Sequence, residues 1–155
     1  MTQKEHAQLL AAALEDLQKA TKWLERSYQK CQPIAGKKSL TDDDLDKMEN
    51  LTSRFARATD LLIQKVYRTV DIVEFESNGT LIDVINRSHK RNLFESVEDI
   101  RSIKDLRNEI SHDYAHMANL SAIFKRVVEK TPALFALIDR ALQYCLKHVD
   151  SSYPA

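Results

Sequence analysis

The segment "TDDDLDKMENLTSRFARATDLLIQKVYRTVDIVEFE", residues 41–76, decides the fold class of this chain. Its first threonine is a typical helix-capping residue, and the three aspartates behind it suit the positive end of a helix dipole. Apolar or small side chains then recur at intervals of three or four, at Met48, Leu51, Phe55, Ala58, Leu62, Val66, Thr69 and Val73. This spacing places them on one face of a helix. The segment therefore predicts one long amphipathic helix over residues 42–76.

A similar stripe precedes this segment, at Leu10, Leu14, Leu17, Thr21, Leu24 and Tyr28. It predicts a helix over residues 4–31, which ends at Gln32-Pro33 because the residue before a proline avoids the helical region. Two long helices joined by a short loop pack as an antiparallel pair.

The remaining predicted helices span residues 80–92, 96–112, 116–129 and 132–149. Gly79 ends the second long helix, while Thr80 and Ser96 are capping residues for the two helices that follow them. Pro132 is expected at the first position of the last helix, where proline is favoured. No segment alternates like a strand. The predicted fold is all-α: an up-and-down antiparallel helical bundle, with four long helices plus short inserted ones, in a single domain over residues 1–155.

Composition limits the classes of partner. The 23 basic residues balance the 23 acidic ones, so binding to nucleic acid needs a local basic patch. No apolar run is long enough for a membrane span and the first residues do not resemble a signal peptide, so we expect a cytoplasmic protein with no membrane partner. Cys31 and Cys145 lie far apart, and we expect buried thiols rather than a disulfide or metal ligands.

A second stretch, "DLRNEISHDYAH" at residues 105–116, carries the candidate chemistry. Asn108 and His112 are four residues apart and share a helix face. Arg107 and His112 are five apart, about 140° around an ideal helix. Either the helix ends near His112 and the chain bends, or Arg107 meets the histidine of a second copy.

These residue types suit metal-free cleavage of RNA through the ribose 2′-hydroxyl. The reaction needs a base and an acid, and His112 can serve as either because histidine titrates near neutrality. The guanidinium of Arg107 suits the charge that grows on the phosphorane. Asn108 can orient the imidazole or the phosphate, and Tyr114 can stack on a base. A symmetric dimer would bring two arginines and two histidines into one cleft.

A purely structural interpretation stays open. In it, Arg107, Glu109 and Asp113 form a solvated face, and His112 and Tyr114 pack at a helix end. Short motifs occur by chance often enough that spacing alone does not decide between this interpretation and a catalytic one.

Two other chemistries also stay open. His112 and His116 have the i, i+4 spacing of zinc-binding helices, although no third ligand is in view. Ser111 adjoins a histidine and is a conceivable nucleophile, but neighbouring residues on a helix point apart and no glycine-rich elbow is present.

A candidate RNA-binding patch lies upstream, beginning in "NRSHKRN" at residues 86–92. Lys90 and Arg91 lie three and four residues after Arg87, and Lys104 lies three residues after Arg101. The five basic residues of this patch lead towards Arg107; they are Arg87, Lys90, Arg91, Arg101 and Lys104. Nearby acidic residues neutralise part of this charge; they are Glu95, Glu98, Asp99 and Asp105.

The stretch "RNEISHDY" is an R-x4-H-x-Y motif with a polar residue directly after the arginine, late in a helical bundle. It resembles the HEPN superfamily, in particular the HepT-like proteins that partner minimal nucleotidyltransferases. The upstream segment "GTLIDVINRSHKR" resembles the helix that precedes the motif in those relatives.

The resemblance implies a homodimer whose two motifs face one cleft, and a metal-independent endoribonuclease toxin that forms 2′,3′-cyclic phosphate ends. Arg107 and His112 match the catalytic pair, Asn108 matches the polar position, and no cofactor is implied. A cognate minimal nucleotidyltransferase would act as antitoxin, and Tyr114 matches the tyrosine that it can modify with AMP. The alternative is a non-catalytic substrate-binding or adaptor subunit of that nucleotidyltransferase.

Overall fold

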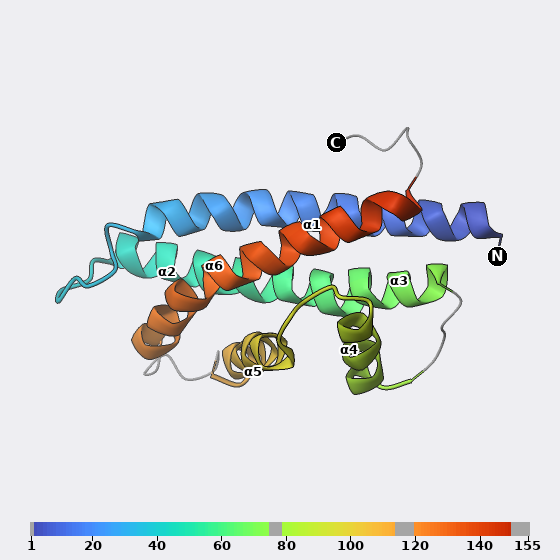
Figure 1. Ribbon diagram of the computed structural model, residues 1–155. Helices are drawn as coiled ribbons and strands as arrows, with labels where there is room; N and C mark the ends of the chain where they lie inside the picture. The colour runs from blue at the N-terminus through green and yellow to red at the C-terminus, as the bar shows by residue number, and fades with distance from the viewer. Residues whose placement is uncertain (1, 75–78, 114–119, 150–155) are drawn as a thin grey trace.

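The computed structural model describes residues 2–74, 79–113 and 120–149. In these residues all the regular structure is helical and no strand is present, which confirms the predicted all-α bundle (Figure 1).

Helix α1 (Gln3–Cys31) packs against a second long helical stretch along most of its length. That stretch consists of α2 (Asp42–Asp60), η1 (Leu61–Tyr67) and α3 (Arg68–Val73), which follow one another without a break. All eight stripe positions predicted for this stretch are buried. The sequence did not predict that η1 is a π-helix.

Local side chains set where two of the helices begin. The hydroxyl of Thr41 accepts a hydrogen bond from the backbone N–H of Asp44, and the Asp44 carboxylate accepts one from the Thr41 backbone, both at 3.1 Å. Thr80 and Asp83 form the same reciprocal pair at the start of α4 (Leu81–Lys90). Each pair satisfies backbone donors that a helix leaves free at its N-terminus, so the capping predictions at both threonines are confirmed.

Helix α4 and the 17-residue α5 (Val97–Asp113) lie across the second long stretch rather than along it (Figure 1). The last long helix, α6 (Leu120–Cys145), runs obliquely over α1 and α2 and is followed by a short 3-10 turn, η3 (Leu146–His148).

The prediction of separate helices over 116–129 and 132–149 was wrong, because α6 passes through Pro132. A proline inside a helix lacks the N–H that would bond to the carbonyl four residues earlier. Here the buried positions keep helical spacing on both sides of it; they are Ile123, Phe124, Val127, Thr131, Leu134 and Ile138. Continuous burial of one face therefore outweighs the local cost of the proline.

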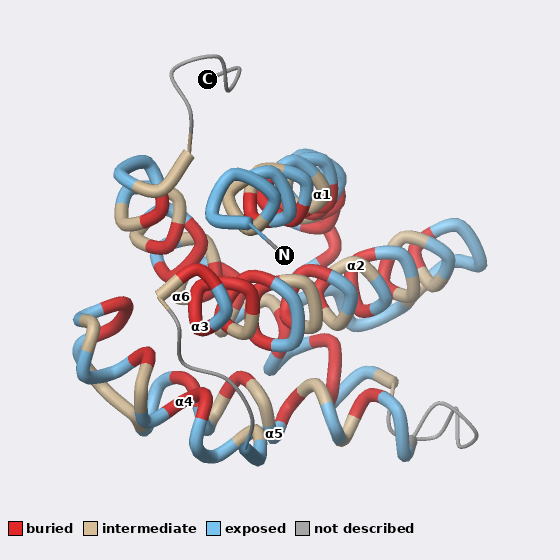
Figure 2. Tube along the Cα trace, turned by 90° about the vertical axis from the view of Figure 1, so that its right-hand side faces the viewer, coloured by how far each residue is buried: buried red, intermediate tan, exposed pale blue. Residues whose placement is uncertain are grey.

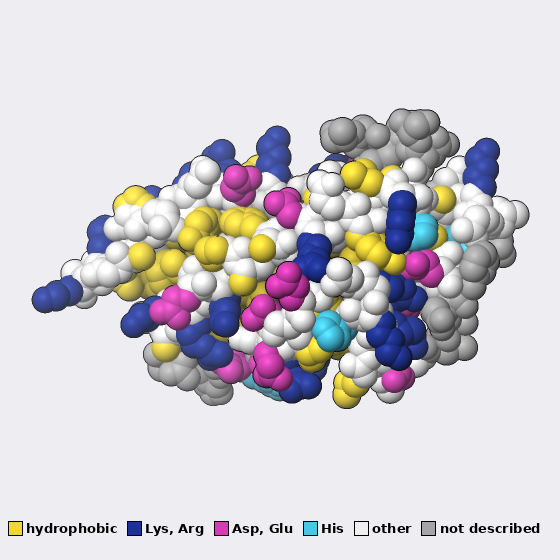
Figure 3. Space-filling view, viewed as in Figure 1, with side chains coloured by type: hydrophobic (Ala, Val, Ile, Leu, Met, Phe, Trp, Pro, Cys, Tyr) yellow, Lys and Arg dark blue, Asp and Glu magenta, His cyan; other side chains and the backbone are white. Residues whose placement is uncertain are grey.

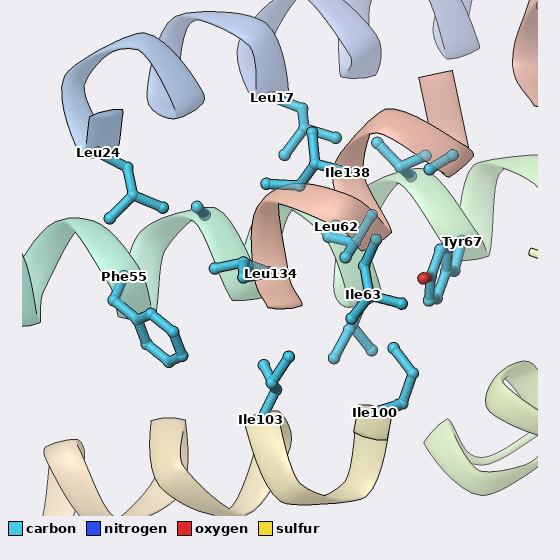
Figure 4. Close-up of a cluster of buried hydrophobic side chains, with 14 of the residues drawn as sticks. Leu17, Leu24, Phe55, Leu62, Ile63, Tyr67, Ile100, Ile103, Leu134 and Ile138 are labelled. Carbon is cyan, nitrogen blue, oxygen red and sulfur yellow. The ribbon is translucent and has the colours of Figure 1, made fainter. Parts of the chain in front are cut away.

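One core joins these helices. Figure 4 shows side chains from α1, from α2 and η1, from α5 and from α6 meeting in the space between them; the labelled ones are Leu17, Leu24, Phe55, Leu62, Ile63, Tyr67, Ile100, Ile103, Leu134 and Ile138. The buried positions of each helix face its neighbours in Figure 2. Cys31 and Cys145 are buried and free, as predicted. None of the described helices has the length and apolarity that crossing a bilayer requires.

Candidate functional site

Arg107 projects from α5 towards α2, where it forms a two-point ion pair with Asp60. Its Nε donates to Asp60 Oδ1 at 2.6 Å and its Nη2 to Oδ2 at 2.8 Å, while Nη1 donates to the Ser111 hydroxyl at 2.7 Å. The hydrogen bond to Asp60 raises the pKa of Arg107, so the side chain is charged at any physiological pH. Three of the five guanidinium N–H groups are used in these contacts, and two have no partner among the described residues.

The rotation of α5 follows from its apolar residues, which are buried against the core at Ile100, Ile103, Leu106 and Ile110. With that face turned inward, Arg107 lies at the edge facing α2 and is half-buried. Asn108 and His112 share the outward face and are exposed. The helix thus presents the amide and the imidazole to solvent and holds the guanidinium against a neighbouring helix.

An open cleft of about 360 Å³ lies beside this ion pair. Its walls come from three helical segments and the start of α4; they are Thr59, Asp60, Ile63, Gln64, Leu81, Lys104, Arg107 and Asn108. Ile63 and Gln64 belong to the π-helix η1, and π-helical turns often occur at functional sites. A cleft that has two cations, an amide and an apolar wall can hold a phosphate together with its sugar.

His112 does not meet Arg107 within one chain. Helix α5 stays regular up to Asp113, so the two side chains point about 140° apart. The described residues show no contact between them. Within the described residues of one chain, α5 thus holds the two groups apart, and it ends at Asp113, directly after His112.

Two predicted residues, Tyr114 and His116, lie outside the described residues. Among the residues that are described, no group of three or more histidine, cysteine, aspartate or glutamate side chains could hold a metal ion. The Ser111 hydroxyl accepts a hydrogen bond from Arg107, and no described contact links it to His112.

The structure separates the members of the predicted RNA-binding patch. Arg87 donates twice to Asp71, at 3.0 and 2.8 Å, and Arg91 pairs with Asp71 and with Glu74, the latter at 2.7 Å. Asp71 is buried on α3, so these two arginines attach α4 to α3. Lys90, between them in sequence, is exposed.

The other two patch residues also differ from each other. Arg101 is exposed and pairs with Glu98 at 2.9 Å on its own helix, whereas Lys104 lines the cleft with Arg107 and Asn108. On the face that Figure 3 shows, basic side chains gather over α4 and over the lower end of α6, with acidic ones between them. The structure thus brings Lys104 to the site and leaves the other four outside it.

Asp60 is the site residue that sequence reasoning missed. It lies 47 residues before Arg107, on a helix whose role was inferred only from its apolar stripe. The sequence offered only a weak signal for Asp60: it lies beside the apolar stripe of its helix, where a polar side chain can contact a residue of the neighbouring helix.

Comparison of the chain with protein-family models, with curated proteins and with solved structures gave no match.

Proposed function

We propose that this protein is a metal-independent endoribonuclease that acts as a homodimer in the cytoplasm. In this proposal it is the toxin of a HepT-type pair, within the HEPN superfamily, and a cognate minimal nucleotidyltransferase restrains it. The observation that carries the proposal is the position of Arg107, on the wall of an open cleft with two free N–H donors and with Asn108 and Lys104 beside it.

The proposed reaction begins when His112 of one chain takes the proton of a ribose 2′-hydroxyl. The 2′-oxygen attacks the adjacent phosphorus, and Arg107 of the other chain stabilises the phosphorane charge. The bond from phosphorus to the 5′-oxygen then breaks, and His112 of the second chain can donate a proton to the leaving oxygen. The products are a 2′,3′-cyclic phosphate and a 5′-hydroxyl. The exposure of His112 supports this scheme, because a histidine on the outer face of α5 can reach a second copy.

Control by the nucleotidyltransferase would act on Tyr114. Transfer of AMP from ATP to its hydroxyl, with release of pyrophosphate, would add a negative phosphate and a bulky base seven residues beyond Arg107. The added charge would compete with RNA for the guanidinium and for Lys104.

One observation favours the second candidate, a non-catalytic adaptor of the nucleotidyltransferase. Asp60 already pairs with Arg107 through two hydrogen bonds, as expected for a structural arginine. In an adaptor the exposed Asn108 and His112 would contact the partner enzyme instead of RNA.

The test is cleavage of a defined RNA by the purified protein in excess EDTA, with the product ends identified by mass spectrometry. The proposal predicts undiminished cleavage in EDTA, 2′,3′-cyclic phosphate ends, and a folded but inactive His112→Ala variant. Ends with a 3′-hydroxyl, or loss of cleavage on chelation, would assign the chemistry to a metal. Absence of cleavage together with unimpaired binding of the nucleotidyltransferase by His112→Ala would favour the adaptor.

A further inference from the structure

The only tryptophan of the chain, Trp23 on α1, has 52% of its surface exposed. Tryptophan is on average a largely buried residue, so an exposed indole on a regular helix calls for an explanation. Two guanidinium groups lie over its ring: the Cζ of Arg54, from α2, is 5.1 Å from a ring centroid, and that of Arg26 is 5.9 Å away. These distances are within the range of cation–π contacts.

Arg54 is held in place without a carboxylate. Its Nη1 donates to the Ser27 hydroxyl at 2.5 Å and to the Trp23 carbonyl at 3.4 Å. Among the described residues, neither Arg54 nor its neighbours Arg26 and Arg57 form a salt bridge. Arg54 is therefore oriented by neutral groups, and none of the three arginines forms a salt bridge in the described part of the chain, although Arg57 interacts electrostatically with Asp16; this balance favours an anionic ligand.

A groove of about 450 Å³ joins these side chains between α1 and α2. Its lining consists of Asp16, Lys19, Ala20, Trp23, Arg54 and Arg57. Asp16 is the one acidic residue in that lining, and it is engaged by Lys65 at 2.6 Å. The groove thus combines an aromatic surface with arginines that form no salt bridge among the described residues, and this combination suits the bases and phosphates of a single-stranded nucleic acid.

The groove is close to the candidate active site along α2. Arg57 is exposed and lies three residues before Asp60, about 4.5 Å along the helix axis at 1.5 Å per residue. Asp60 in turn binds Arg107 at the cleft. One turn of α2 therefore separates the last arginine of the groove from the ion pair of the candidate site.

We propose that this groove binds single-stranded RNA next to the scissile phosphate, with a base stacked on Trp23 and phosphates bound by Arg54 and Arg57. The choice of RNA as the ligand rests on the proposed function, whereas the stacking and charge argument does not. A contact with a second protein molecule is the competing use of this surface, because tryptophan and arginine are both enriched in protein interfaces. Arginines that form no salt bridge favour the polyanion, and the experiment below distinguishes the two ligands.

The experiment uses the full-length His112→Ala chain, so that RNA is bound without being cut, and a single-stranded RNA oligonucleotide as the probe. Trp23 is the only indole, so its emission should be quenched in a saturable way as the oligonucleotide is added. In anisotropy measurements with labelled oligonucleotide, a further Trp23→Ala change should weaken binding about tenfold. A further Arg57→Ala change should lower the slope of log affinity against log salt by about 0.7. The matched control Lys125→Ala, an exposed cation on α6, should leave the slope unchanged.

Unchanged Trp23 emission at saturating RNA, or equal slopes for Arg57→Ala and Lys125→Ala, would overturn the groove assignment. Emission that changes with protein concentration but not with RNA would overturn it as well and would identify a contact between copies. These results are independent of the cleavage assay. RNA cleavage that depends on His112 but not on Trp23 would refute the groove alone, whereas quenching by RNA without any cleavage by the wild-type protein would refute the proposed nuclease alone.

Discussion

Two arginine–aspartate clusters in this protein use the same chemistry in different surroundings. At the cleft, Asp60 pairs with Arg107, and the side chains are 41% and 30% exposed. Under α4, Asp71 pairs with Arg87 and Arg91, and its own side chain is only 5% exposed. The first cluster has free donors facing an open cleft, and the second joins two helices.

The difference shows that burial, more than the presence of an arginine, decides which cation a ligand can reach. A buried carboxylate needs its partners, because leaving it unpaired costs several kcal/mol, so the arginines of Asp71 are committed to the fold. A pair that reaches solvent, as the half-buried Asp60–Arg107 pair does, contributes only about 1 kcal/mol, so a phosphate can compete for Arg107 at little cost in stability. The same residue type is thus structural on α4 and available for function on α5.

The largest expected effect on activity follows from Arg107→Ala. If Arg107 stabilises the phosphorane, its loss should lower kcat by a hundred- to thousandfold, about 3–4 kcal/mol of transition-state stabilisation. The free energy of unfolding should change by only about 1 kcal/mol, because the pair with Asp60 is half-buried and reaches solvent. Single-turnover cleavage and urea unfolding of the same preparation measure both. An active variant, or one that is inactive because it is unfolded, would contradict the contrast between the clusters.

The largest expected effect on stability comes from Asp71→Ala. Removing this carboxylate takes away the buried partner that Arg87 and Arg91 share, and it should cost about 3–5 kcal/mol in the free energy of unfolding. Asp60→Ala is the matched control, because it removes the aspartate of a half-buried aspartate–arginine pair, and it should cost only about 1 kcal/mol. If guanidinium chloride unfolding shows equal losses of unfolding free energy for Asp71→Ala and Asp60→Ala, the distinction between the two clusters is wrong.

A smaller effect on activity is expected for Asp60→Ala. Arg107 keeps its charge but loses the two bonds that orient it, so kcat should fall about tenfold, less than in Arg107→Ala. Asp60→Glu should recover part of the loss, because a carboxylate is restored at a slightly longer reach. A rise in kcat on removing Asp60 would mean that the aspartate restrains the arginine rather than positioning it.

Helix ends and core stripes were predictable because they depend on neighbouring residues: Thr41 and Thr80 carry their own capping partners three positions on. The continuity of α6 through Pro132 was not predictable from the sequence, because it depends on burial of the helix against the other helices. The π-helical turn over 61–67 leaves no mark in the apolar spacing that predicts helices.

The candidate site likewise has features that the sequence predicted and features that it did not. Spacing within one helix predicted that Asn108 and His112 share a face and that Arg107 does not. The partner of Arg107 could not be predicted, because Asp60 is distant in sequence and is brought near only by helix packing. The same holds for the ion pair between Arg87 and the buried Asp71. Local sequence cannot distinguish a basic residue that will face solvent from one that a buried carboxylate on another helix will bind.

The smallest predicted effect separates those basic residues. Lys90→Ala should leave stability unchanged and lower the slope of log RNA affinity against log salt by at most about 0.7, because Lys90 is exposed and can contact a single phosphate. Arg87→Ala should do the reverse, with reduced stability and an unchanged slope, because Arg87 is bound to Asp71. Salt titrations of RNA binding and unfolding of both variants check this prediction. A larger decrease of the slope in Arg87→Ala than in Lys90→Ala would show that Arg87 contacts RNA despite its bond to Asp71.

The central claim is that Arg107 of one chain and His112 of another form one site, and mixed dimers test it most directly. Arg107→Ala and His112→Ala chains with different tags are co-expressed, and the heterodimer is purified through both tags. Each heterodimer holds one site with both residues and one with neither. The account predicts cleavage clearly above that of either variant alone but below half that of the wild-type dimer, because the restored site has Arg107 and the His112 that takes the 2′-proton but lacks the second His112 that protonates the leaving oxygen. Verified heterodimers that cleave no better than the parent variants would contradict it.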